Sequence, residues 1–120
     1  MGTKTAPQPV DFARLAVDVA SENQAADIAM LDIRAVSDFA DYFVIMTADS
    51  ARQIDALVRD IEEALEAEGK RLHHREGTAD GGWVLLDFSD VIVHLFQPGA
   101  REFYHIEGAW SQGVETVRIQ

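Results

Sequence analysis

The sequence predicts a single α/β domain, in which helices flank a mixed β-sheet in the order α-β-β-α-β-β-β-α. Short apolar runs of strand length alternate with longer segments in which apolar residues recur every three or four positions. The chain has 120 residues, which is the usual size of one domain. It is 48% hydrophobic and 26% charged, so it has enough apolar material for a core.

The first half of the chain is predicted to contain two helices with two strands between them. The first helix spans residues 11–25 with Asp11 as its N-cap, because four apolar residues fall on one face: Phe12, Leu15, Ala16 and Val19. Residues 27–33 and 41–48 read as strands, and the second is almost continuously apolar, as expected for a strand covered on both faces. The second helix begins after Ser50, with Gln53 completing a capping box, and ends at Gly69.

The second half is predicted to contain a weak strand at 72–76, a polar loop, a β-hairpin over 83–96 and a terminal helix that begins at Pro98. The hairpin turns at Ser89-Asp90. Three residues of the terminal helix are expected to share a face: Phe103, Ile106 and Trp110. We expect residues 1–10 to be a flexible tail, residues 11–112 to form the domain, and residues 113–120 to be a C-terminal tail.

The two faces of the hairpin differ in composition, because side chains alternate along each strand. One face is wholly apolar and must be core: Val84, Leu86, Phe88, Val91, Val93 and Leu95. The other, which we call the mixed face, carries Trp83, Leu85, Asp87, Ile92, His94 and Phe96. A charge and an imidazole are costly in a dry core, so we expect the mixed face to be at least partly exposed and to form a protein-binding patch. The alternative is that the terminal helix covers this face.

Charge and composition narrow the class of partner. The formal net charge is 10 − 21 = −11, which disfavours direct nucleic-acid binding as the main anchor and suits a basic protein. The same charge could simply keep the domain soluble. Cysteine is absent, which excludes disulfides and fits a reducing compartment. No apolar run approaches the ~20 residues of a membrane span, and no targeting segment stands at the start, so we expect a cytoplasmic protein without membrane association.

Several residues could in principle carry chemistry. Asp87 and His94 are diagonal neighbours that could form a general base, but no recognisable nucleophile motif accompanies them. His73 and His74 are adjacent in a strand and therefore point to opposite faces, so they cannot chelate one metal ion together. We accordingly expect no cofactor and no bound metal.

The segment "SDFAD" contains the paired carboxylates Asp38 and Asp41, which are similar to those of nucleotidyl transferases, although the preceding Gly-Ser element is missing. The alternative function is therefore a small nucleotidyl-transfer or hydrolytic enzyme that uses Asp38, Asp41 and Asp87.

Three blocks resemble, in the right order, the signature blocks of the ribosomal silencing factor family, also called the Iojap family: "SDFADYFVIMTADSARQIDAL", "EGTADGGWVLLDFSDVIVHLF" and "REFYHIEGAW". The resemblance implies a fold related to nucleotidyltransferases without their catalytic residues, and no catalysis. It implies binding to a basic protein on the inter-subunit face of the large ribosomal subunit. Such binding would sterically block the small subunit and repress translation under nutrient limitation.

The resemblance also implies site residues. In the family a tryptophan lies at the ribosomal contact, and it matches Trp83; signature positions also match Asp87, His94 and the pair Glu76-Gly77. Together with the mixed face, this predicts six partner-binding residues: Trp83, Leu85, Asp87, His94, Phe96 and Glu76. The chain departs from the family at Ser89-Asp90, where Gly-Asp is common, and at Thr47-Ala48, where Thr-Gly is common. The apolar surface also allows a homodimer, although nothing in the sequence fixes its interface.

Overall fold

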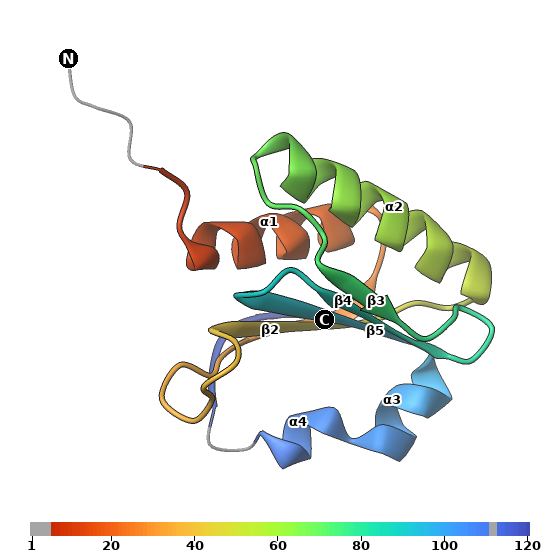
Figure 1. Ribbon diagram of the computed structural model, residues 1–120. Helices are drawn as coiled ribbons and strands as arrows, with labels where there is room; N and C mark the ends of the chain where they lie inside the picture. The colour runs from red at the N-terminus through yellow and green to blue at the C-terminus, as the bar shows by residue number, and fades with distance from the viewer. Residues whose placement is uncertain (1–5, 111–112) are drawn as a thin grey trace.

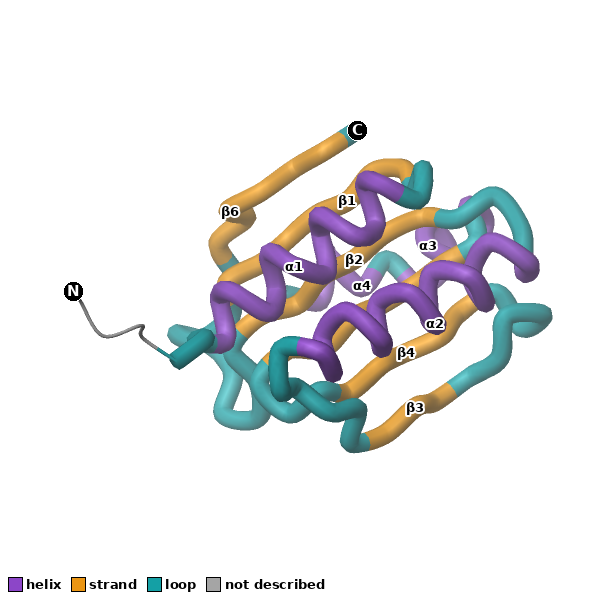
Figure 2. Tube along the Cα trace, turned by 90° about the horizontal axis from the view of Figure 1, so that it is seen from above, coloured by secondary structure: helices purple, strands orange, loops and turns teal. Residues whose placement is uncertain are grey.

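The computed structural model describes residues 6–110 and 113–120, which form a six-stranded mixed sheet with helices on both faces (Figure 1). The strand order is β3-β4-β5-β2-β1-β6, and β2 and β5 are the parallel pair at its centre. Two long helices cover one face of the sheet, and two short helices lie on the other (Figures 1 and 2). The elements are α1 (Pro9–Glu22), β1 (Ala26–Asp32), β2 (Tyr42–Thr47), α2 (Ala51–Ala67), β3 (His74–Glu76), β4 (Trp83–Asp87), β5 (Val91–Phe96), α3 (Pro98–Tyr104), α4 (Ile106–Ala109) and β6 (Val114–Ile119).

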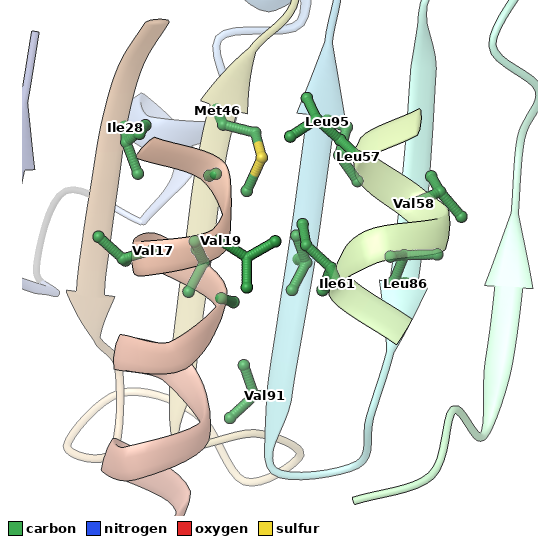
Figure 3. Packing of buried hydrophobic residues seen from close by; sticks show 14 of the residues in the cluster. Val17, Val19, Ile28, Met46, Leu57, Val58, Ile61, Leu86, Val91 and Leu95 are labelled. Atoms are coloured by element: carbon green, nitrogen blue, oxygen red, sulfur yellow. The ribbon is translucent and has the colours of Figure 1, made fainter. Parts of the chain in front are cut away.

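The predicted fold class is confirmed, and the element order agrees with the predicted order from the first helix through to α3. The hairpin has the predicted register, with Trp83 opposite Phe96 and Leu85 opposite His94. The predicted core face of the hairpin is completely buried beneath α1 and α2. Figure 3 shows the packing of this larger core, in which Leu86 and Leu95 meet the apolar stripe of α2.

The helix ends follow capping chemistry with one correction. α1 begins at Pro9 after the N-cap Gln8, two residues earlier than predicted, and Asp11 accepts a hydrogen bond from the Gln8 N–H at 2.8 Å. Asp11 therefore supports the helix start from inside the first turn. α2 begins as predicted, because the Ser50 hydroxyl accepts from the Gln53 N–H at 3.1 Å. It ends before Gly69, whose φ of +93° suits glycine.

The C-terminal region differs from the prediction in two ways. The terminal helix is divided into α3 and α4 at His105, which has a left-handed φ of +47°. Because of this break, Phe103 points to solvent, while Ile106 and Trp110 pack onto the sheet. In addition, residues 113–120 were expected to be a tail, and this was wrong: β6 pairs antiparallel with β1 at the sheet edge.

The face of the sheet opposite α1 and α2 carries a second, smaller core. It consists of Ala29, Leu31, Ile33, Ala40, Phe43, Ile45, Ile92 and Phe96, against which Trp83, Leu85, Ile106 and Trp110 pack. Burial on both faces explains why β2 reads as an almost continuous apolar run. Within residues 6–110 and 113–120, no helix combines the length and the apolar composition needed to cross a bilayer.

Candidate partner-binding site

The two strands of the hairpin differ in how far their side chains on the mixed face are exposed: those of β5 are buried and those of β4 are partly exposed. On β5, Phe96 is 0% and His94 2% exposed, because α3 packs against this strand. On β4, which lies one strand nearer the edge, Trp83, Leu85 and Asp87 remain half-buried. The expected exposure is therefore confirmed for β4 and wrong for β5. His94 and Phe96 are too deeply buried to offer the contact surface that we predicted for them.

The two buried aromatic residues of β5 instead hold Trp83 in place. The Trp83 indole N–H donates a hydrogen bond to Nδ1 of His94 at 3.2 Å. The Trp83 ring is stacked on Phe96 with centroids 5.1 Å apart and lies 4.5 Å from the ring of Tyr104. A tryptophan fixed on three sides loses little side-chain entropy when a partner binds it.

His94 is neutral near physiological pH, because burial lowers the pKa of its imidazole to about 4. Since Nδ1 accepts the indole hydrogen bond, the ring proton belongs on Nε2. Nε2 is buried and has no hydrogen-bond partner among the described residues. The His94 ring also meets the Phe43 ring edge-on, with ring centroids 4.8 Å apart. An unpaired buried donor costs free energy, so the useful contact of His94 is the one that orients Trp83.

A groove of about 220 Å³ lies beside Trp83 and is lined by Glu76, Gly77, Trp83 and Leu85. Gly77 forms its wall with a φ of +82°, and a Cβ at this position would collide with the carbonyl oxygen of Trp83. Only glycine therefore lets the chain pass so close to the start of β4. Glu76 pairs with Leu85 in the sheet and is exposed, so it gives the groove an acidic rim.

Asp87 shapes the hairpin turn. Its carboxylate accepts a hydrogen bond from the Ser89 N–H at 2.7 Å, and Ser89 has a φ of +76°. This local hydrogen bond explains how serine occupies a left-handed position that usually favours glycine. Asp87 lies opposite Ile92, and His94 bonds to Trp83, so the two residues do not form the His–carboxylate pair of a general base.

The two aspartates of the "SDFAD" segment lie just before β2. Asp41 precedes β2, and its N–H donates to the carbonyl of Asp90 at 2.8 Å; Asp38 is exposed in the loop before it. Over residues 6–110 and 113–120, no group of three His, Cys, Asp or Glu side chains is arranged to hold a metal ion. His74 forms an exposed pair with Glu76 at 3.1 Å.

Sequence reasoning missed the contribution of α3 to this site. Tyr104 was not among the predicted residues, although its ring centroid lies 4.5 Å from that of Trp83, closer than the 5.1 Å of Phe96. The register contained a signal: Phe96 ends β5 opposite Trp83, so the helix that follows must start beside Trp83. Arg101 on the same helix, which is charged and buried, was missed as well.

Comparisons with known proteins show which family the chain resembles. The family described as "Ribosomal silencing factor during starvation" matches residues 4–120. A relative from Zymomonas mobilis named ribosomal silencing factor RsfS is 34% identical over 113 residues, which cover 94% of this chain and 85% of that protein. The mouse protein named mitochondrial assembly of ribosomal large subunit protein 1 is 28% identical and is matched over 79% of this chain and 43% of its own length.

A solved structure extends the likeness to three dimensions. The crystal structure of a Chromobacterium violaceum protein superimposes with a TM-score of 0.84 at 29% identity, covering 95% of this chain and 94% of the other. The three sequence blocks, the sheet order and the groove beside Trp83 all lie within the region that the family match covers. The chain belongs to the family of ribosomal silencing factors.

Proposed function

We propose that this protein binds a basic protein on the inter-subunit face of the large ribosomal subunit and thereby prevents the small subunit from joining. In this way it represses translation in the cytoplasm when nutrients are scarce. The observation that carries the proposal is the partly exposed Trp83, held rigidly beside a groove with an acidic rim. Membership of the silencing factor family and the net charge of −11 support the same partner chemistry.

The contact surface in this proposal consists of Trp83, Leu85, Asp87 and Glu76, with His94 and Phe96 beneath it as supports. In this proposal the domain acts without catalysis, because its size is sufficient to keep the two ribosomal subunits apart. Its extents are 49 × 30 × 26 Å, so a bound copy would hold the two subunit faces apart by tens of ångströms. The acidic surface also disfavours ribosomal RNA as the main anchor.

The test of the proposed function is subunit joining. Purified protein is expected to cosediment with isolated large subunits and to reduce the fraction that associates with small subunits. An equal concentration of an unrelated acidic protein controls for charge alone. If a saturating concentration leaves the association profile unchanged, the proposed function is wrong.

Replacing Trp83 with alanine is expected to weaken binding to large subunits by about 2 kcal/mol or more, roughly thirtyfold, because aromatic anchors dominate interface energies. Since Trp83 is half-buried against Phe96 and Tyr104, the melting temperature should fall as well. Melting and binding are therefore measured on one preparation, at a temperature where the variant is fully folded.

The matched control for this variant is Trp110→Ala. Trp110 packs against Phe43 of the second core and against the exposed Phe39, with ring centroids 5.1 and 5.5 Å away, and is not among the residues that line the groove. It should lose stability but keep its affinity while folded. Equal losses of affinity in the two variants would show that the Trp83 effect is one of folding rather than of contact.

Association with the basic partner is expected to slow as salt rises, while dissociation changes less. Long-range attraction between an acidic domain and a basic surface speeds encounter, and it is screened beyond a Debye length of about 8 Å at physiological ionic strength. Stopped-flow or surface-based kinetics measure the association and dissociation rates over salt concentrations from about 50 to about 500 mM, a roughly tenfold range around physiological ionic strength. Association rates independent of salt would assign the charge to solubility alone.

A further inference from the structure

The end of α3 presents two aromatic side chains at the surface. Phe103 is 81% exposed, the largest exposed fraction among the large apolar side chains of the described residues, and Tyr104 is 49% exposed. Their rings meet edge-on at 5.1 Å. A single exposed apolar residue is ordinary, but this pair adjoins the candidate site. The Tyr104 ring lies 4.5 Å from the ring of Trp83, which lines the groove.

The helix backbone that carries the aromatic pair is held in place. Arg101, two residues before Phe103, is buried; it binds the Glu107 carboxylate of α4 through two hydrogen bonds of 3.0 Å and the Thr47 hydroxyl at the end of β2 at 2.9 Å, which fixes α3 on α4 and on the sheet. His105 then ends the helix in a left-handed conformation, and its N–H donates to the carbonyl of Arg101 at 3.0 Å. An exposed aromatic on such a fixed element has a preorganised backbone, so binding need only order its side chain.

The charges around this surface indicate the kind of partner. Glu102 is exposed on α3, Glu76 on the groove rim and Asp80 in the loop that joins β3 to β4. The one basic residue of α3, Arg101, is buried and already paired with Glu107. α3, the groove and the loop before β4 therefore all carry exposed carboxylates. Two copies of this chain, each with a formal charge of −11, would bring like charges together there.

We propose that Phe103 and Tyr104 extend the docking surface of Trp83 onto α3, and that Phe103 inserts into an apolar recess bordered by Lys or Arg on the basic partner. The inference rests on the proposed function and adds a second anchor to it. Trp83 and Leu85 then contact the partner from the sheet, and Phe103 contacts it from the helix. Glu102, which precedes Phe103 on α3, then forms a charge contact with the Lys or Arg at the rim of the recess.

The test compares Phe103→Ala with Val114→Ala, using the full chain and isolated large ribosomal subunits as the probe. Val114 is 61% exposed but lies on β6, at the opposite edge from β3 and β4, so its truncation removes apolar surface away from the proposed contact. We expect Phe103→Ala to bind at least tenfold more weakly with an unchanged melting temperature. Val114→Ala should bind like the wild-type chain.

The outcomes separate the two proposals. If wild-type protein binds and blocks joining, but Phe103→Ala binds equally well, the extension onto α3 is wrong and the proposed function stands. If wild-type protein does not bind large subunits, both fail. Sedimentation velocity of the free proteins tests a second copy as the occupant: a wild-type dimer that Phe103→Ala converts to a monomer would overturn the inference and make this face a self-association surface.

Discussion

Replacing Arg101 with methionine is expected to lower the free energy of unfolding by roughly 3–5 kcal/mol, because the substitution breaks a buried ion pair on one side only. The side chain of Arg101 is 8% exposed. Its guanidinium donates two hydrogen bonds of 3.0 Å to Glu107, one of 2.9 Å to the Thr47 hydroxyl and one to the carbonyl of Asp27. Methionine fills much of the volume but removes this donor from the Thr47 hydroxyl and the Asp27 carbonyl, and it leaves Glu107 paired with Arg118 alone.

The same contacts explain why the effect should reach the whole C-terminal region. They join α3 and α4 to the start of β1 and the end of β2. The Arg101 hydrogen bond is also the main cause that lowers the pKa of Glu107, so the pair is stable only while that carboxylate is ionised. Chemical denaturation at neutral pH measures the loss, and hydrogen exchange of β6 and α4 should increase with it.

Arg118→Met is the matched control. Arg118 lies on β6 and contacts Asp27 at 2.5 Å, Glu107 at 3.2 Å and Glu115 at 3.5 Å, but its side chain is 31% exposed. We expect its removal to cost about 1 kcal/mol or less, as for other partly exposed pairs. The double variant Arg101→Met/Glu107→Leu should recover part of the Arg101 loss, since the half-buried Glu107 carboxylate that has lost its closest partner is then removed as well. An Arg101→Met protein as stable as the wild type would show that the network contributes no net stability.

The parts of the fold that could be predicted are those whose signal is local. The hairpin register follows from strand alternation and a two-residue turn, so Trp83 opposite Phe96 could be derived without a structure. α2 was predictable because its cap and its apolar stripe lie in one contiguous segment. In both elements, local preference and tertiary packing agree.

The missed parts have no local signal. β6 lies at the sheet edge, and most of its residues are exposed, so it has no buried face for alternation to mark. The break between α3 and α4 occurs at His105 in a left-handed conformation, for which glycine or asparagine would have been the usual indication. Without that break, Phe103, Ile106 and Trp110 read as one face of a continuous helix.

The candidate site was predictable to the same extent. Alternation correctly placed Trp83 and Leu85 on the face opposite the main core, with partial exposure. The burial of His94 and Phe96 depends on how α3 returns across the sheet, and that path is set by Arg101 and its distant partners Asp27 and Thr47. Interactions across such separations in sequence leave no periodicity for a single sequence to reveal.

The stability of this protein is expected to fall as the pH drops from about 6.5 to about 4, and part of that fall should belong to His94. Burial lowers the pKa of His94 from 6.5 to about 4 in the folded chain. Between these values the unfolded state binds a proton that the folded state does not, so acid favours unfolding. Integrated over this range, at about 1.4 kcal/mol per pH unit, His94 should account for about 3 kcal/mol.

The comparison of wild-type protein with His94→Gln isolates this contribution from the many carboxylates that titrate nearby. Glutamine does not titrate, and its amide oxygen can still accept the indole hydrogen bond, so the variant should be less stable at pH 7 by its packing loss. That deficit should shrink, and can reverse, as the pH falls toward 4, because only the wild type loses the His94 contribution. Denaturant unfolding at several pH values measures both curves, with His73→Gln as a control that removes a solvent-exposed imidazole.

The same titration should be visible at Trp83 itself. A protonated His94 has no free Nδ1 lone pair, so it cannot accept the 3.2 Å hydrogen bond from the indole. In a Trp110→Phe background Trp83 is the only tryptophan, because the chain contains two. Its fluorescence is then expected to change as the pH approaches 4 while far-ultraviolet circular dichroism still reports a folded chain, and this change should be absent in His94→Gln. Parallel stability curves for wild type and His94→Gln between pH 7 and 4 would show that His94 does not couple protonation to the position of the Trp83 ring.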